Sequence, residues 1–267
     1  MSRAAAVAVP ALRSGTTATG VYYEVHGSGT PLFLGFPFMA SHAEVFGAEA
    51  GAARDRFVAG LIDRYCVLLA DYPSIGRSAT IPPAQLTIDR VCSDMLAVAD
   101  AAGFDRFAWW GATFGAVTGM ALAARSDRVT ALLSAGWSPL GTPYPAMVEA
   151  ALAQLHDPPA HARVMLRDLA QYAQWSTFYS SLGAGWEEGT VPRIRCPRAV
   201  IYGEHAESSV GDCALPIAAT VRARRADLVR RGWRVVELPG ADASLVLQPE
   251  PLVPAARRFF DSVLSDY

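Results

Sequence analysis

The chain has 267 residues, of which 52% are apolar and 18% charged, and this balance predicts one large globular domain. Its net charge of -2 offers no basic surface for nucleic acid or an anionic membrane, so neither is expected as a partner. All 23 cationic residues are arginines. The lack of lysine excludes a Gly-Lys phosphate-binding loop, a pyridoxal Schiff base and a lysine general base.

The four cysteines stand far apart, and no C-x-x-C pair occurs among them: Cys66, Cys92, Cys196 and Cys213. This spacing argues against a disulfide framework or a zinc–cysteine site and favours a reducing, cytoplasmic setting. No apolar run approaches the roughly 20 residues that span a bilayer. Residues 1–16 have an early arginine and a short apolar run broken by Pro10, so a flexible tail is expected there instead of a signal peptide.

In chain order, short β-rich runs alternate with helical stretches. Strands are expected at residues 21–25, 31–36, 66–70, 107–110, 131–135, 199–202 and 234–238. Most of these runs are continuously apolar, as a sheet covered on both faces requires. Apolar stripes at helical spacing predict helices from residue 88 to Gly103 and over 252–264. The alternation predicts an α/β fold with a mostly parallel, twisted sheet flanked by helices.

Residues 138–195 interrupt this alternation. They show no strand pattern but two aromatic-rich helical segments, near 146–156 and over 160–182. An insertion of this kind predicts a helical cap between two parts of one core, residues 17–137 and 196–267. Apolar walls with few polar groups are typical of ligand sites, so some of the aromatic side chains are expected to line a pocket. The candidates are Trp137, Trp175 and Tyr179.

The most informative segment is the strand that runs into Gly111-Ala-Thr113-Phe-Gly115 and a following helix of small residues. It resembles the G-x-S-x-G nucleophile elbow of the α/β-hydrolase family, with threonine in place of serine. Three further segments resemble the family's motifs in the same order: Leu34-Gly-Phe-Pro37, Asp71-Tyr-Pro-Ser-Ile-Gly-Arg-Ser78, and Cys196 to Glu204 followed by Gln248-Pro-Glu-Pro251. The resemblance covers the chain from about residue 20 to the end and implies the α/β-hydrolase fold with a helical cap.

The family's catalytic residues are not recognisable. A triad needs a nucleophile, an acid and a histidine in that chain order. Thr113 stands at the nucleophile position, Ala206 at the usual acid position, and no histidine follows His205. A threonine hydroxyl is a poor nucleophile without a base, and losing triad members costs about 10⁴–10⁶ in rate. Ordinary triad hydrolysis is therefore not expected.

A rearranged triad stays open as an alternative. His205 lies in the loop that usually supplies the acid, and Asp242 in the loop that usually supplies the histidine, so the two could have exchanged places. In that arrangement the imidazole is expected to lie too far from Thr113 to take its proton. His42 follows the loop 35–38 and either faces the pocket or touches nothing.

The other histidines are interpreted as surface residues of a hairpin or of a turn in the cap: His26, His156 and His161. None of the five histidines has a metal-binding spacing such as H-E-x-x-H, so no metal and no cofactor are expected.

The resemblance also implies that the backbone N–H groups of Phe36 and Phe114 point at the space above Thr113 as an oxyanion hole, with both residues beside the substrate. The favoured function is a non-hydrolytic enzyme that acts on an apolar, carbonyl-containing small molecule by cyclisation, elimination, isomerisation or carbon–carbon cleavage. Such roles are known for family members in natural-product pathways. An esterase, thioesterase or lactonase using Thr113 and a relocated histidine, and a non-catalytic ligand-binding protein, are the alternatives. A homodimer is compatible with the sequence.

Overall fold

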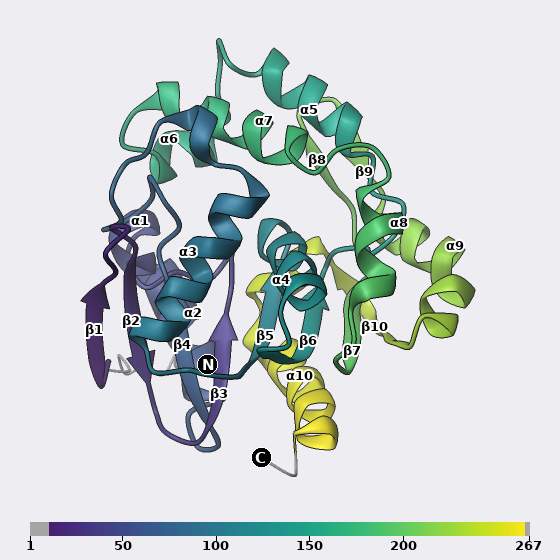
Figure 1. Cartoon of the computed structure of the whole chain (residues 1–267). Helices are drawn as coiled ribbons and strands as arrows, with labels where there is room; N and C mark the ends of the chain where they lie inside the picture. Colours follow the sequence, from purple (N-terminus) through teal and green to yellow (C-terminus); the bar gives the residue numbers. More distant parts are fainter. Residues whose placement is uncertain (1–10, 265–267) are drawn as a thin grey trace, which may run out of the picture.

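The computed structural model describes residues 11–264, which form an eight-stranded sheet in the order β1-β2-β4-β3-β5-β6-β7-β10 (Figure 1). The strands are β1 (Arg13–Thr16), β2 (Tyr22–His26), β3 (Thr30–Leu34), β4 (Tyr65–Ala70), β5 (Phe107–Ala112), β6 (Val129–Ala135), β7 (Arg198–His205) and β10 (Trp233–Asp242). β2 pairs antiparallel with β1 and β4, and all other neighbours are parallel. The predicted α/β class with a mostly parallel sheet is confirmed.

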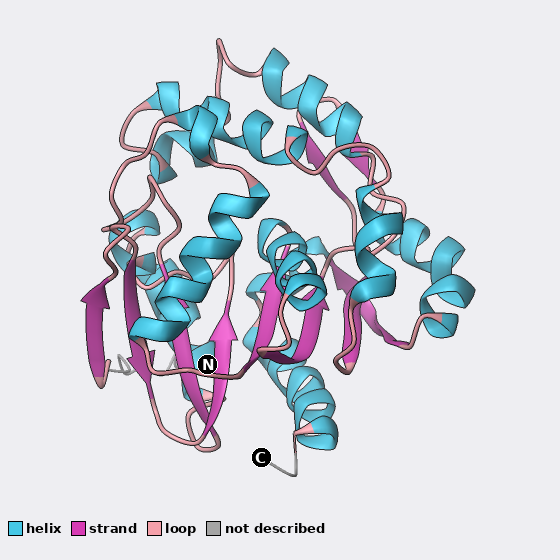
Figure 2. Ribbon diagram, in the orientation of Figure 1, coloured by secondary structure: helices cyan, strands magenta, loops and turns pink. Residues whose placement is uncertain are grey.

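Helices cover both faces of the sheet, as Figure 2 shows. One face carries α3 (Ile88–Ala101), α4 (Phe114–Arg125) and α9 (Ile217–Arg230), and the other carries α2 (Ala48–Ala59) and α10 (Pro249–Val263). Neighbouring side chains of a strand point to opposite faces. Trp109 of β5 accordingly packs with the α3 and α4 cluster, and Trp110 packs with the α2 and α10 cluster. Both indoles are fully buried, which is why this strand reads as one apolar run.

The sheet extends beyond several predicted limits. β7 and β10 continue to His205 and Asp242, which pair with each other after an irregularity that follows Leu238. Their last residues are mostly small or polar, and one is Pro239, so they carry no apolar strand pattern. The expected tail over 1–16 is also too long, because Arg13–Thr16 forms β1 on the edge of the sheet. β1 is mostly exposed and is paired through its backbone, which leaves no sequence signal. Residues 1–10 lie outside the described residues.

Between β6 and β7 the chain forms a helical segment, residues 138–195. It contains α5 (Tyr144–Ala153), α6 (Ala160–Met165), α7 (Ala173–Ser180) and α8 (Trp186–Thr190), with 3₁₀ turns at Leu169–Tyr172 and Val191–Arg193. The helix expected over 160–182 is divided, because Leu166 is extended and Asp168 caps the first 3₁₀ turn by accepting the Ala170 N–H. Figure 1 shows α5, α6 and α7 above the carboxyl ends of the parallel strands.

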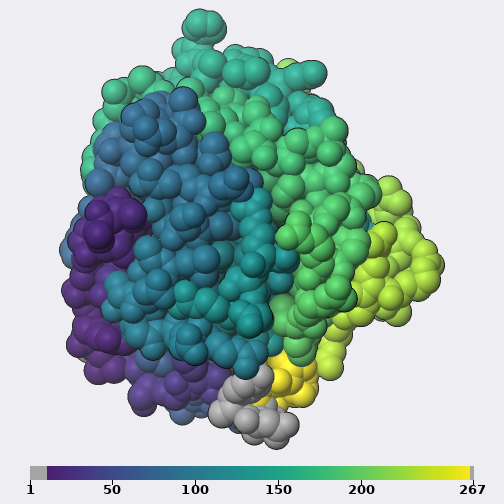
Figure 3. Space-filling view, viewed as in Figure 1, coloured from purple at the N-terminus to yellow at the C-terminus, as the bar shows by residue number. Residues whose placement is uncertain are grey.

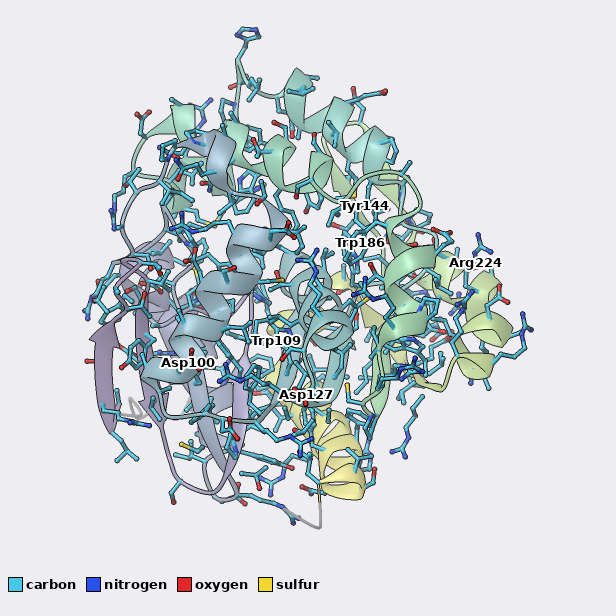
Figure 4. The ribbon with its side chains drawn as sticks, viewed as in Figure 1. Asp100, Trp109, Asp127, Tyr144, Trp186 and Arg224 are labelled. Carbon is cyan, nitrogen blue, oxygen red and sulfur yellow. The ribbon has the colours of Figure 1, made fainter. Side chains whose placement is uncertain are left out.

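Aromatic rings hold the helical segment together. Tyr144 of α5 lies edge-on to Trp186 of α8, with ring centroids 5.8 Å apart, and it stacks at 6.3 Å on Tyr179 of α7. Figure 4 shows Tyr144 and Trp186 next to each other where α5 approaches α8. After β7 the chain adds a hairpin of β8 (Ser208–Val210) and β9 (Cys213–Leu215) beside α5, which the sequence did not predict. In the described residues no helix is long and apolar enough to cross a membrane.

Helix α9 stands out from the side of the molecule in the space-filling view (Figure 3). Its buried residues Val221 and Leu228 join it to the core near β7 and β10. On its outer side, Arg222 donates to the Glu237 carboxylate of β10 at 2.8 and 3.0 Å. This helix therefore covers the far edge of the sheet and takes no part in the cavity described below.

Helix α4 approaches β5 so closely that a side chain at Gly119 would clash with the strand. A Cβ atom on Gly119 would lie 2.3 Å from Cδ1 of Trp109, whose indole is held by a 2.9 Å hydrogen bond from Nε1 to the carbonyl oxygen of Gly115. We predict that Gly119→Ala lowers the free energy of unfolding by about 1–3 kcal/mol through overpacking, as measured by urea denaturation.

Gly189→Ala is the matched control, because Gly189 lies in α8 with nothing within 4 Å of an added Cβ. Alanine is favoured over glycine inside a helix, so this variant should be as stable as the wild type or slightly more stable. Equal unfolding free energies for the two variants would contradict the close packing of α4 on β5.

Candidate active site

Thr113 occupies a strained turn between β5 and α4. Its backbone has φ 48° and ψ -120°, and Ser74 is the one other non-glycine residue with positive φ between residues 11 and 264. This conformation costs a β-branched residue about 1–3 kcal/mol. A Cβ on Gly111 would lie 2.3 Å from the carbonyl oxygen of Gly115, and one on Gly115 would lie 2.3 Å from that of Phe36. The sharp turn expected from the motif is therefore present, and its glycines are required by close backbone contacts.

The hydroxyl of Thr113 is isolated. Its Oγ1 atom is buried and has no hydrogen-bond partner among the described residues. A threonine hydroxyl attacks a carbonyl only when a neighbouring base removes its proton. Within residues 11–264, no side chain is in position to do so.

Thr113 lies on the wall of a partly open cavity of about 450 Å³ between the core and the helical segment. This size is within the range of small-molecule sites. Four of the five aromatic residues expected beside the substrate line it: Phe36, Phe114, Trp175 and Tyr179. Trp137 does not line this cavity. It is 3% exposed and belongs to the core directly after β6, because its carbonyl oxygen accepts the Ser134 hydroxyl at 3.0 Å.

The polar groups of the cavity wall are neutral. Gln154, Tyr172 and Ser209 contribute them together with Thr113, and the Tyr172 hydroxyl donates to Oε1 of Gln154 at 2.7 Å. In the described part of the chain, no carboxylate or arginine lines this cavity. The wall therefore suits an uncharged, largely apolar ligand.

His161 was expected in a solvated turn of the cap; the residue is solvent-exposed as expected, but it lies on a helix and also lines the cavity. His161 of α6 lines the cavity together with Met165, one helical turn further along. Partial burial lowers the pKa of His161. The i to i+4 spacing of a histidine and an apolar residue on a short helix was the available signal, because such residues share a helix face.

His42 does not reach the cavity. It lies on α1 (His42–Phe46), is 6% exposed, and packs against Phe46 with ring centroids 4.9 Å apart. Burial, together with the smaller effect of the positive charge of Arg54, lowers the pKa of His42 to about 4. Neither of the two alternatives left open for His42 describes it, because α1 turns the imidazole into the protein, where it contacts Phe46 and does not line the cavity.

His205 and Asp242 lie opposite each other on β7 and β10, so the two loops do meet. Both residues are exposed, however, and neither is on the cavity wall. Asp242 accepts the Ser244 N–H at 2.8 Å and the Ser244 hydroxyl at 2.6 Å, which makes it the cap of the next 3₁₀ turn. His205 lies 3.8 Å from Glu204. The structure does not bring this pair to Thr113.

The motif residue Asp71 is structural. Its buried carboxylate accepts the Ser41 N–H at 2.8 Å, the Ser41 hydroxyl at 2.5 Å and the Arg77 N–H at 2.8 Å. Burial raises the pKa of Asp71. These bonds tie the end of β4 to the start of α1. The next residue, Tyr72, changes the expected oxyanion hole, because its hydroxyl accepts the Phe36 N–H at 3.2 Å.

Comparison with known proteins identifies the fold. No known family profile matches the chain. Residues of the chain are 36% identical over 121 positions to a protein of Azorhizobium caulinodans that is named as a carbamate hydrolase, RutD. The match covers 44% of this chain and 42% of that protein, so it spans less than half the length of this curated relative.

Two solved structures match nearly the whole chain. The enol-lactonase of Burkholderia xenovorans LB400 is similar with a TM-score of 0.68 and 20% identity, covering 93% of this chain and 99% of that one. A thermophilic esterase of Thermogutta terrifontis is similar with a TM-score of 0.68 and 17% identity, covering 94% and 98%. The chain therefore has the α/β-hydrolase fold that its motifs predicted.

The buried His42 predicts a specific loss of stability in acid. Its folded pKa lies below the ordinary value of 6.5, so its contribution is complete above pH 6.5 and is lost as the pH falls towards 4. Between pH 7 and pH 5, this one group should lower the free energy of unfolding by about 2 kcal/mol. In His42→Gln the decrease should be smaller by that amount, as measured by chemical denaturation at each pH.

His156→Gln provides the control, since His156 is exposed in the loop between α5 and α6. This variant should lose stability with falling pH as the wild type does. If His42→Gln shows the same acid dependence as His156→Gln, His42 is not the buried titrating group.

Proposed function

We propose that this chain is a hydrolase of small, uncharged, largely apolar carbonyl compounds such as esters, lactones or carbamates. The observation that carries the proposal is the aromatic cavity of about 450 Å³, without carboxylate or arginine on the described part of its wall, that includes the strained Thr113 at the start of α4. The similarity to proteins named as an enol-lactonase, an esterase and a carbamate hydrolase supports hydrolysis over the non-hydrolytic reactions favoured from the sequence.

The proposed binding mode places the substrate carbonyl beside Thr113. The first N–H groups of a helix have no partner within the helix, and its N-terminus carries a partial positive charge. Phe114 is the first residue of α4 and lines the cavity, so its N–H is the donor for the developing oxyanion. The aromatic rings around this point exclude water from the apolar part of the substrate.

The proposed base is His161, the one histidine on the cavity wall in residues 11–264. Its lowered pKa keeps the imidazole neutral at pH 7, so that it can accept a proton. A water molecule gives that proton to His161 while its oxygen attacks the carbonyl carbon. The isolated Thr113 hydroxyl then donates a hydrogen bond to the carbonyl oxygen and is not itself acylated.

The role of His161 predicts a large loss of activity in His161→Gln. With an aryl ester as substrate, kcat/KM should fall by about 10²-fold, which is typical for loss of a general base. Wild-type activity should decline below the ordinary histidine pKa of 6.5 and not at neutral pH, because the pKa of His161 is lowered. His205→Gln, a change in an exposed histidine outside the cavity, should leave kcat/KM unchanged. Equal activity of the two variants would remove His161 from the mechanism.

The role of Thr113 predicts a moderate effect and no covalent intermediate. Thr113→Ala should retain measurable turnover, because the attacking water and its base remain. In ¹⁸O-labelled water, both the wild type and Thr113→Ala should place one labelled oxygen in the acid product, and mass spectrometry should find no acylated protein. An acyl group trapped on Thr113, with complete loss of turnover in Thr113→Ala, would favour the alternative in which this threonine is the nucleophile. Substrate conversion without incorporation of label would favour a non-hydrolytic reaction.

A further inference from the structure

Tyr72 lies at the carboxyl end of β4, directly after Asp71, and its side chain is 1% exposed. The hydroxyl accepts the Phe36 N–H at 3.2 Å. The ring lies edge-on to the rings of Phe36 and Phe114, with centroids 6.2 and 5.0 Å apart. Tyr72 does not line the cavity, although both of these phenylalanines do. It therefore contacts the site from behind its wall.

The backbone of Phe36 is held against the start of α4. Its carbonyl oxygen accepts the Ala112 N–H at 2.8 Å, and a Cβ on Gly115 would lie 2.8 Å from its nitrogen. The Phe36 nitrogen and the first N–H groups of α4 thus surround the same place beside Thr113. A developing oxyanion is best stabilised by two N–H groups directed at it, but here the Phe36 N–H is directed at the Tyr72 oxygen instead.

The acceptor is fixed by its surroundings. The Thr118 hydroxyl is within hydrogen-bonding reach of Tyr72 and donates to the carbonyl oxygen of Phe114 at 3.0 Å. Burial raises the pKa of Tyr72, so the phenol stays protonated. The Tyr72 oxygen is therefore a permanent, neutral acceptor for the Phe36 N–H.

We infer that Tyr72 is a positioning residue that determines substrate specificity. Because its hydroxyl accepts the Phe36 N–H, the site keeps one backbone N–H donor for the oxyanion. The enzyme is thereby restricted to carbonyl compounds with a good leaving group. The inference rests on the proposed hydrolysis. Loss of one oxyanion donor typically lowers kcat by about 10²–10³-fold. An aryl ester tolerates that loss, because its leaving oxygen departs readily as an anion.

The same bonds form and break in the hydrolysis of every ester. The water oxygen forms a bond to the carbonyl carbon, its proton goes to the base, and the bond from that carbon to the leaving oxygen breaks. An aryl oxide carries the electron pair away without needing a proton. An alkoxide requires protonation and a longer-lived oxyanion, for which the second donor is needed.

The test compares wild type, Tyr72→Phe and the control Tyr23→Phe across acetate esters whose leaving groups range from nitrophenol to ethanol. Tyr23→Phe likewise removes a tyrosine hydroxyl that bonds to the backbone, here donating to the Ala101 carbonyl oxygen at 3.1 Å, but Tyr23 lies on β2 and does not line the cavity. The wild type and Tyr23→Phe should show a steep dependence of kcat on the leaving-group pKa. In Tyr72→Phe, kcat for the alkyl esters should rise by on the order of 10²-fold and the dependence should flatten.

The backbone amide of Phe36 gives a readout that does not depend on activity. In ¹H–¹⁵N spectra its proton should shift upfield and exchange faster in Tyr72→Phe, and in Tyr72→Leu as a second variant, but not in Tyr23→Phe. An unchanged Phe36 amide in both Tyr72 variants overturns the inference, and so does an unchanged leaving-group dependence in active variants. If the wild type hydrolyses none of the esters, the proposed function fails. The chemical shift and exchange rate of the Phe36 amide proton then still show whether Tyr72 accepts its hydrogen bond.

Discussion

The contact between the start of α4 and the ends of β3 and β5 is the constraint from which the rest of the site follows. Gly111, Gly115 and the carbonyl oxygen of Phe36 approach so closely that no side chain fits between them. This approach forces Thr113 to positive φ and places the N-terminus of α4 beside the chain after β3. Packing around the turn opposes the energetic cost of that conformation, and the buried indole of Trp109 lies directly against Gly119 of α4.

The cavity above this contact is built from parts that are distant in the chain. Phe36, Thr113 and Phe114 form its floor, while the helical segment and the β8–β9 hairpin add the remaining walls. Its wall has no carboxylate or arginine in residues 11–264, and two of its polar groups, Tyr172 and Gln154, are hydrogen-bonded to each other. The site therefore selects a ligand by shape and by a few hydrogen bonds, with the field of α4 as its main electrostatic feature.

The fold was predictable because its signals are local. Apolar runs such as the one through Trp109 and Trp110 mark buried strands, and Gly-x-Thr-x-Gly marks the sharp turn. Polar ends of strands, the exposed β1 and the β8–β9 hairpin carry no such pattern, since backbone pairing holds them. The site was less predictable. His42 and His161 are both histidines in helical stretches, and only the orientation of α1 and α6 decides that one is buried and the other faces the cavity.

Helix α6 has a consequence for how this site can change during evolution. It is short, it ends where Leu166 becomes extended, and it presents His161 and Met165 to the cavity from one face. A shift of α6 that makes room for a bulkier ligand also displaces the imidazole of His161. In the described residues, the size of the cavity and the position of the one histidine on its wall are therefore mechanically linked through α6.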